Sequence, residues 1–347
     1  MSRTGAAWLS AAALALGAAT SAAQTTAKIA LDDKPGRAQR IVQAAKKEGS
    51  LNFYSSLPEK DLHVLTSEFE KRYGVKVNLW RASSVRVLQR VTTEARAGRH
   101  DPDVVNASSP EVEAMHREKL LQDVRSEHHK DLIAEAMPPH RAWVPAFFNI
   151  FVQAYNTTKV KKEDLPKTYQ DLLKPVFKGK LGIEANDQEW LCGVIKQIGE
   201  ETTVKLFRQL TATNGLSVRS GHSLLNNLVV SGEIPLGLTV YSYMTEQARK
   251  KGAPVDWFAI EPAIGRSNGV AVARNAPHPH AALLFYDYMI GEAQPLMATL
   301  ELMPASRKVQ SSLRGIRIAY LDAGAMLDDR VRCDRLWDEL IMKRPAK

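Results

Sequence analysis

Pairs of serines follow the first three predicted strands of the chain, and each pair stands where a helix is expected to begin. The pairs are Ser55-Ser56, Ser83-Ser84 and Ser108-Ser109. Ligands of open α/β sheets bind beyond the carboxyl ends of the strands, where helix N-termini favour anions and polar oxygens. Serine is also a preferred N-cap residue, so capping alone explains any single pair. Because the pairs recur at one edge, we expect a shared polar site there, lined by Ser55, Ser56, Ser83, Ser84 and Ser108.

The second half of the chain adds two groups of polar side chains in similar positions. Arg219 and Ser220 lie between a predicted strand and a helix that begins near His222. Tyr241 and Tyr243 come at the end of another apolar strand, and residues two apart share a face if the strand continues that far. Two phenols can bind Fe³⁺ through oxygen or donate hydrogen bonds to an oxyanion, and ordinary packing of both rings is an equal alternative. We add Arg219, Ser220, Tyr241 and Tyr243 to the expected ligand-binding residues.

Motifs of the common enzyme and nucleotide-binding classes are missing from the sequence. It contains no P-loop, no G-x-G-x-x-G, no G-x-S-x-G and no H-E-x-x-H pattern. His222 is the one histidine that we expect at the same edge as the serines and tyrosines. We therefore expect a binding protein with no catalytic residues and no cofactor, and a secreted hydrolase on a similar scaffold is the alternative.

Strands that alternate with helices must position these side chains. Residues 51–54, 75–80 and 103–107 read as strands, and the segment between the first two places Leu62, Leu65 and Phe69 on one helical face. This alternation predicts a parallel, doubly wound α/β sheet. A long apolar run from Ala142 to about Asn156 then predicts a strand that connects two lobes, and a run over 268–273 predicts the return.

The first residues of the chain have the layout of a secretory signal peptide. A short basic start precedes an Ala- and Leu-rich stretch, which ends in Ser21-Ala22-Ala23. We expect residues 1–23 to be removed and the mature protein to reach the periplasm. The formal charge is +9, but the basic residues are scattered, so no nucleic-acid partner is expected. Cys192 and Cys333 can form one disulfide in an oxidising compartment, but their spacing leaves open whether they meet.

Several short segments, in order and spacing, resemble the bacterial extracellular solute-binding proteins of family 1, and within them the ferric-iron-binding-like branch. These segments are 51–56, 69–77, 101–105, 154–157, 177–182, 251–257 and 277–282. The resemblance implies a two-lobed type II periplasmic-binding-protein fold, with hinge strands between the lobes and a ligand cleft. It divides the chain into lobe 1 (48–145 plus 265–305), lobe 2 (146–264) and a C-terminal helical segment (306–347) that packs on the lobes.

The same resemblance implies a partner and a class of solute. Such receptors hand a small molecule to an inner-membrane ABC permease, and we expect this one to be a monomer. Iron-binding members use two adjacent tyrosines of the second lobe, and Tyr241 matches one of them. Here Ser242 separates Tyr241 from Tyr243, and Ser55-Ser56 offers neither a histidine nor a carboxylate. We therefore expect an oxyanion such as a phosphonate or a carboxylate, and an iron(III) receptor that uses Tyr241 and Tyr243 is the alternative.

Overall fold

The computed structural model describes residues 26–311, 313 and 315–343, so the expected signal peptide at 1–23 lies outside the described residues. The chain divides into two compact units. Unit 1 comprises the described part of Met1–Ala146 with Asn268–Leu296 and Ala305–Val309. Unit 2 comprises Phe147–Ser267, Met297–Pro304 and the described part of Gln310–Lys347. Within the described residues, no helix is both long enough and apolar enough to cross a membrane.

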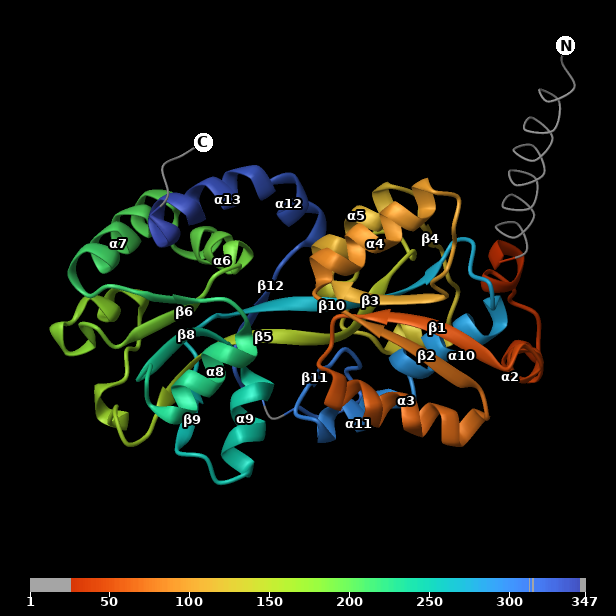
Figure 1. Ribbon diagram of the computed structural model, residues 1–347, viewed down its shortest axis with the longest axis horizontal. Coiled ribbons are helices and arrows are strands. Elements are labelled where there is room, and N and C mark those ends of the chain that lie inside the picture. The colour runs from red at the N-terminus through yellow and green to blue at the C-terminus, as the bar shows by residue number, and fades with distance from the viewer. Residues whose placement is uncertain (1–25, 312, 314, 344–347) are drawn as a thin grey trace, which may run out of the picture. The chain divides into compact units, whose positions relative to one another are not determined.

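Unit 1 is built on a small sheet in the order β2-β1-β3-β10 (Figure 1). β1 (Ser50–Ser55) pairs in parallel with β2 (Lys76–Arg81) and with β3 (Val104–Ser108). The C-terminal half of β10 (Ala263–Ala273) pairs antiparallel with β3 and with the short β4 (Leu121–Gln122). The predicted parallel ladder is therefore present, and the returning strand closes it in the opposite direction.

Helices cover both faces of the unit 1 sheet, with α4 and α5 on one face and α3 on the other (Figure 1). The helices with residues in this unit are α2 (Arg37–Glu48), α3 (Glu59–Tyr73), α4 (Ser84–Arg96), α5 (Ser109–Arg117), α10 (Pro279–Ile290), α11 (Ala293–Thr299) and the 3₁₀ turns η1 (Glu127–Asp131) and η2 (Ala134–Ala136). Gly74 ends α3 with a left-handed φ of 68°, which a residue without a Cβ adopts at little cost. The core contains edge-to-face contacts of Phe285 with Phe53 and Phe69.

In unit 2 the strands follow the order β5-β8-β6-β7. β6 (Leu181–Glu184) pairs in parallel with β7 (Ser217–Arg219) and β8 (Leu236–Tyr241), while β5 (Val144–Asn156) runs antiparallel to β8 and to β9 (Val255–Phe258). Two short strands complete the sheet, β11 (Met303–Pro304) on β5 and β12 (Ile318–Tyr320) on β10. The carboxyl ends of β6, β7 and β8 thus lie at one edge.

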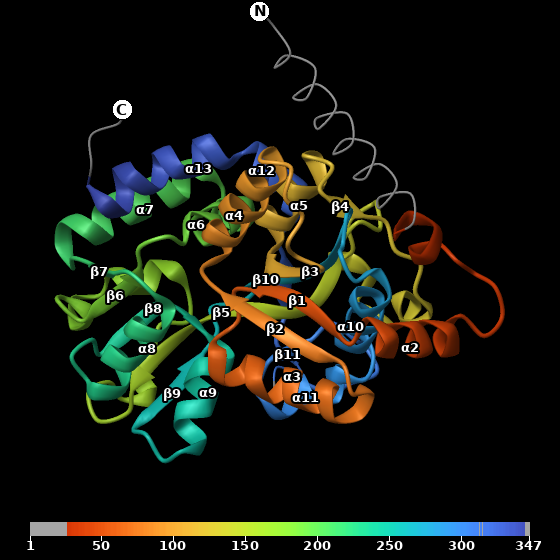
Figure 2. The same ribbon diagram turned by 45° about the vertical axis from the view of Figure 1, so that its right-hand side comes forward.

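Helices also cover both faces of the unit 2 sheet, and both views place α6 and α7 on one face and α8 and α9 on the other (Figures 1 and 2). These helices are α6 (Gln188–Ile198), α7 (Glu200–Thr213), α8 (His222–Ser231), α9 (Ser242–Lys250), α12 (Ala323–Asp328) and α13 (Arg330–Trp337). Single turns lie at η3 (Lys162–Asp164), η4 (Tyr169–Leu173), η5 (Pro175–Phe177) and η6 (Asp338–Met342). Gly193 lets α6 approach β10 closely, since a Cβ there would lie 2.8 Å from Cδ1 of Ile264.

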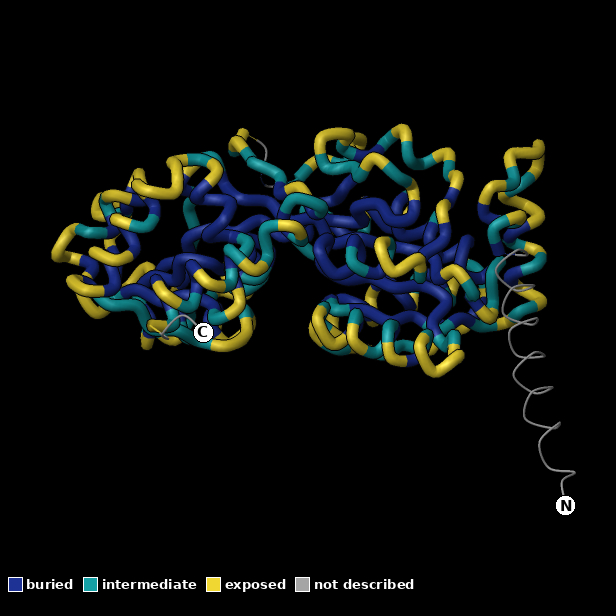
Figure 3. The backbone as a smooth tube through the Cα atoms, turned by 90° about the horizontal axis from the view of Figure 1, so that it is seen from above, coloured by how far each residue is buried: buried dark blue, intermediate teal, exposed yellow. Residues whose placement is uncertain are grey.

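Two long strands carry the chain between the units. The boundary from unit 1 to unit 2 falls within β5, and the boundary back falls within β10. Every residue of both strands is buried, and they lie within the dark tube of Figure 3. The sequence predicted both crossings, although β10 begins at Ala263, earlier than the expected 268.

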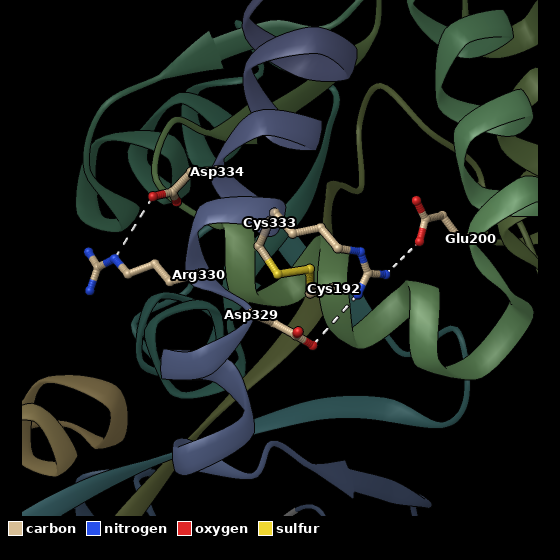
Figure 4. The surroundings of a disulfide bond; sticks show 7 residues. Cys192, Glu200, Asp329, Arg330, Cys333 and Asp334 are labelled. Carbon is tan, nitrogen blue, oxygen red and sulfur yellow. Dashed lines mark hydrogen bonds and ion pairs between the residues drawn. A yellow bond between two sulfur atoms is a disulfide. The ribbon is translucent and has the colours of Figure 1, made fainter. Parts of the chain in front are cut away.

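Cys192 and Cys333 form a disulfide, which the sequence had left open (Figure 4). It joins α6 to α13 across 141 residues, with a Cα–Cα distance of 5.9 Å. Arg332, beside Cys333, forms ion pairs with Glu200 and with Asp329. The bond therefore anchors the helix whose first residues follow the carboxyl end of β6.

Candidate functional site

The predicted serines of unit 1 gather at the carboxyl ends of β1 and β3, where most of their hydroxyls bond within the protein. Ser55 Oγ donates to Asn106 Oδ1 at 3.0 Å and accepts from the Leu57 N–H at 3.2 Å. Asn106 in turn donates through Nδ2 to the Gly269 carbonyl at 2.9 Å. Both Ser55 and Asn106 are fully buried. This network ties β1 to β3 and β10.

Ser84 and Ser108 form a second pair at the same edge. Their hydroxyls lie 2.9 Å apart, and the Ser108 N–H donates to Ser84 Oγ at 3.0 Å. Ser83 is exposed and precedes α4 without a side-chain capping bond, and Ser56 is half-buried. We call Ser55, Ser84, Ser108 and Asn106 the serine edge. Its members are neutral and form hydrogen bonds to one another.

Arg219 and Ser220 lie at the end of β7, on the surface of unit 2. The Arg219 guanidinium donates to the Val218 carbonyl at 3.2 Å and lies 3.8 Å from the exposed Glu233 carboxylate. Ser220 is exposed. The contacts of Arg219 are therefore with its own strand and with a surface carboxylate.

Tyr241 and Tyr243 are both buried, and their rings stack with centroids 6.1 Å apart and an interplanar angle of 16°. The strand does not continue through them as the sequence suggested, because α9 begins at Ser242. The Tyr241 hydroxyl accepts a hydrogen bond from Arg266. Burial raises the pKa of Tyr241 well above its usual range, so the free phenol is neutral.

A buried group of three ionisable side chains adjoins Tyr241. Glu184 is the last residue of β6, Asp187 directly precedes α6, and His222 is the first residue of α8. One potential ligand atom from each lies within 4.8 Å of the others. The His222 ring also packs on the Tyr241 ring at a centroid distance of 3.8 Å. We call Glu184, Asp187 and His222 the acidic cluster.

The three members of the acidic cluster differ in their hydrogen bonding. Glu184 accepts hydrogen bonds from the N–H groups of Gly221 and Asn186 and from the Asn186 amide. Asp187 is 1% exposed, and neither of its carboxylate oxygens has a hydrogen-bond partner of good geometry. The Nε2 atom of His222 lies 3.3 Å from Oδ1 of Asp187. Buried carboxylates are normally paired, so Asp187 is an exception that calls for an explanation.

Burial is the largest cause of the pKa shifts of Asp187 and His222. It raises the pKa of Asp187 well above the usual range, with the charge of Glu184 as the second cause. Burial, followed by the nearby Arg266, lowers the pKa of His222 to about 3. The imidazole is therefore neutral at neutral pH, with a lone pair available on one nitrogen.

Arg266, on β10, supplies the positive charge of the region. Its guanidinium lies 3.0 Å from Glu189 and donates to the Tyr241 hydroxyl, while Nε is buried without a hydrogen-bond partner. Burial opposes the charge of Arg266, but the surrounding acidic groups, among them the Glu189 carboxylate, raise its pKa above the usual range, so it stays a cation. Arg266 was missed because it lies just before the run over 268–273 that predicted the returning strand.

Two residues of the acidic cluster were also missed from the sequence. Glu184 and Asp187 flank the turn from β6 to α6, the same position that drew attention to the serines. The presence of two carboxylates at a strand-to-helix turn could have marked these residues as site candidates. Their convergence with His222 depends on the parallel pairing of β6 with β7, which places Glu184 opposite Arg219 just before α8.

Comparison with known proteins identifies the family. The model of the bacterial extracellular solute-binding proteins matches residues 55–294. The chain belongs to this family. A curated relative, the Fe(3+)-binding periplasmic protein of Serratia marcescens, is 23% identical over 213 residues, which are 60% of this chain and 62% of the relative. The aligned part of the chain thus spans less than two thirds of that solute-binding protein.

Solved structures of other solute-binding proteins share the two-lobed type II fold, as predicted. Iron-bound HitA from Pseudomonas aeruginosa superposes with a TM-score of 0.71 and 20% identity, over 84% of this chain and 99% of that chain. AfuA from Actinobacillus pleuropneumoniae, with bound fructose-6-phosphate, superposes with a TM-score of 0.74 and 20% identity, over 85% of this chain and 99% of that chain. The fold is common to proteins with different solutes, so the solute must be argued from the site.

Proposed function

We propose that this chain is the periplasmic solute-binding component of an ABC importer, which captures a small molecule and presents it to an inner-membrane permease. Membership of the solute-binding family carries this proposal, and the expected signal peptide supports the periplasmic location. The histidine expected near the serines, His222, has the Thr239 carbonyl and Asp187 as its polar neighbours. It is not paired with a serine as a general base, which is what the alternative of a hydrolase requires.

For the solute, we propose a positively charged species that binds at the carboxyl ends of β6 and β8. The observation behind this choice is the local balance of charge. Glu184 and Asp187 lie together in the acidic cluster, and the nearby Arg266 guanidinium is already paired with Glu189. An oxyanion would meet these carboxylates without compensation. Arg219, which the oxyanion prediction relied on, contacts Val218 and Glu233 instead.

An oxyanion remains the second candidate because of one observation at Arg266. Its buried Nε–H has no acceptor, and the Tyr241 hydroxyl lies beside it. A carboxylate or phosphonate oxygen would satisfy that donor. The iron(III) alternative belongs with the cationic solutes, since the curated relative is named as an Fe(3+)-binding protein.

A thermal-shift screen of the purified mature protein tests the proposal. The panel comprises Fe³⁺, divalent metals, polyamines, thiamine, phosphonates and dicarboxylates. A cationic solute at about 100 times its Kd should raise the melting temperature by roughly 5 °C, because only the folded state binds it. A rise only with the oxyanions would favour the second candidate. If the protein hydrolyses a chromogenic ester and binds no solute of the panel, the proposed receptor function is refuted.

Two matched tyrosine variants test the location of the binding site. Tyr241→Phe removes the hydroxyl that accepts from Arg266, and should weaken binding of the solute found in the screen at least about tenfold. Tyr155→Phe, on β5, is the control, because it removes the hydroxyl of another buried tyrosine of unit 2, whose ring packs on Phe258. Equal affinities in the two variants would move the solute away from Tyr241. Size-exclusion chromatography of the same samples tests the expected monomer.

A further inference from the structure

We infer that Glu184, Asp187 and His222 form a binding site for one first-row divalent cation, such as Zn²⁺ or Mn²⁺. The site lies wholly within unit 2 and uses neither tyrosine as a required ligand. The inference rests on the proposed function only where it treats the ion as the transported solute. The site itself follows from the three side chains.

Three different elements bring the ligand atoms together. β6, the turn before α6 and the start of α8 each contribute one residue, and the candidate ligand atoms lie within 4.8 Å of one another. Metal–ligand bonds of about 2.0–2.2 Å place the ligands of one ion roughly 3–4.4 Å apart. Small rotations of the side chains are therefore enough to close the site.

Asp187 supplies the observation that points to a missing ligand. It is 1% exposed, and neither carboxylate oxygen has a hydrogen-bond partner of good geometry, although the Thr239 hydroxyl lies close enough to interact with it. Burying a carboxylate in this way is strongly unfavourable unless a positive group meets it. The nearby guanidinium of Arg266 is already engaged by Glu189 and Tyr241. A bound cation would compensate Asp187 directly.

His222 is oriented as a metal-binding histidine is. Nδ1 lies 3.3 Å from the Thr239 carbonyl, which assigns the ring proton to Nδ1 and leaves a lone pair on Nε2. That nitrogen lies 3.3 Å from Asp187 Oδ1, so two acceptors face each other whenever Asp187 is ionised. The Tyr241 ring holds the imidazole in this orientation from one side. An ion between the two acceptors would turn an unfavourable contact into two bonds.

Hydrogen bonds from neighbouring groups hold the Glu184 carboxylate in place, as they commonly do for metal ligands. Its carboxylate accepts from the Gly221 N–H at 2.8 Å and from the Asn186 amide at 3.0 Å. Oε1 accepts both of these bonds, while Oε2 accepts only from the Asn186 N–H and keeps a further lone pair for a metal. The mixed set of one imidazole and two carboxylates suits Zn²⁺, Mn²⁺ or Fe²⁺ better than Ca²⁺ or Mg²⁺, which prefer oxygen alone.

Titration calorimetry of the metal-free mature protein tests the site, with Zn²⁺, Mn²⁺ and Mg²⁺ as separate titrants. We expect one Zn²⁺ or Mn²⁺ per chain, much weaker Mg²⁺ binding, and at least a 100-fold loss of affinity in Asp187→Asn. Asp256→Asn removes a more exposed carboxylate of the same unit and should leave the affinity unchanged. The electron paramagnetic resonance signal of bound Mn²⁺ should be lost in Asp187→Asn and kept in Asp256→Asn.

Two outcomes would overturn the inference. In the first, neither Zn²⁺ nor Mn²⁺ binds the native chain. In the second, Asp187→Asn binds them as tightly as the native chain does. In both cases Asp187 and His222 share a proton and the cluster is structural. Glu184→Gln, checked for folding by circular dichroism, provides a second variant with the same expected loss. If an organic solute still binds in the presence of EDTA, the proposed receptor function is supported even though the metal site is refuted.

Discussion

The two units place polar side chains at the same position, beyond the carboxyl ends of parallel strands, but they use them differently. In unit 1 the side chains are neutral, and Ser55, Ser84, Ser108 and Asn106 bond to one another. In unit 2 they are ionisable, and the carboxyl group of Asp187 and the Nε of Arg266 are buried without a hydrogen-bond partner of good geometry. A satisfied network contributes to folding, whereas unsatisfied buried groups are characteristic of sites that await a ligand. The difference assigns a structural role to the serine edge and a binding role to the acidic cluster.

The disulfide of unit 2 should give the largest effect, because it anchors α6, which begins directly after Asp187. For a closed loop of 141 residues, the chain-entropy model predicts a loss of about 4–5 kcal/mol of unfolding free energy in Cys192→Ala/Cys333→Ala. Hydrogen exchange should show α6 and α13 losing protection while β1 and β3 keep theirs. A reductant should lower the native protein to the level of the variant and leave the variant unchanged. Equal loss of protection in both units would mean that they unfold together.

Removal of Asn106 tests the structural role of the serine edge. Asn106→Ala leaves the Ser55 hydroxyl and the Gly269 carbonyl unpaired in the core, which should reduce the free energy of unfolding by about 2–3 kcal/mol. Urea denaturation measures this loss. The control is Asn78→Ala, since Asn78 is exposed, and it should stay within about 0.5 kcal/mol of the native protein. A large loss of solute affinity in Asn106→Ala, without loss of stability, would give the serine edge a binding role after all.

The sequence predicts where polar side chains gather, but not which of them are satisfied. Periodicity located the ends of β1, β3 and β8, and with them Ser55, Ser108 and Tyr241, because strand and helix signals are local. Hydrogen bonding is not local. Asn106 is 51 residues from Ser55 and 163 from Gly269, and Arg266 is 77 residues from Glu189. The roles of these residues therefore depend on tertiary pairings that no pattern in a single sequence reports.

His129 of unit 1 should make the stability of the protein depend on pH in acid. Burial, then the charges of Arg141, His128 and Arg37, lowers the pKa of His129 to about 4, and its Nε2 lies 2.8 Å from the Tyr286 hydroxyl. The unfolded pKa is about 6.5. Protonation is therefore disfavoured in the fold, so stability is complete above about pH 6.5 and falls as the pH drops toward 4.

The variant His129→Gln isolates this effect, since it can keep the bond to Tyr286 without titrating. Urea denaturation between pH 7 and pH 4 should show a loss that is smaller in the variant by roughly 1–2 kcal/mol. His63→Gln removes an exposed histidine and should follow the native protein. If both variants follow the native curve, acid sensitivity arises from other groups and not from His129.

The smallest change in stability should come from Asp187→Asn, although this residue is as deeply buried as Asn106. Asp187 loses no hydrogen bond of good geometry, and the substitution removes a group whose ionised form burial disfavours. In EDTA at pH 7 the unfolding free energy should therefore stay the same or rise by about 1 kcal/mol. Added Zn²⁺ should then stabilise the native chain and not the variant. A loss above about 1 kcal/mol in EDTA would make Asp187 structural, as Asn106 is, and would remove the contrast between the two edges. Stability retained together with metal affinity lost is the pattern of a residue kept for binding, since such residues are commonly suboptimal for the fold.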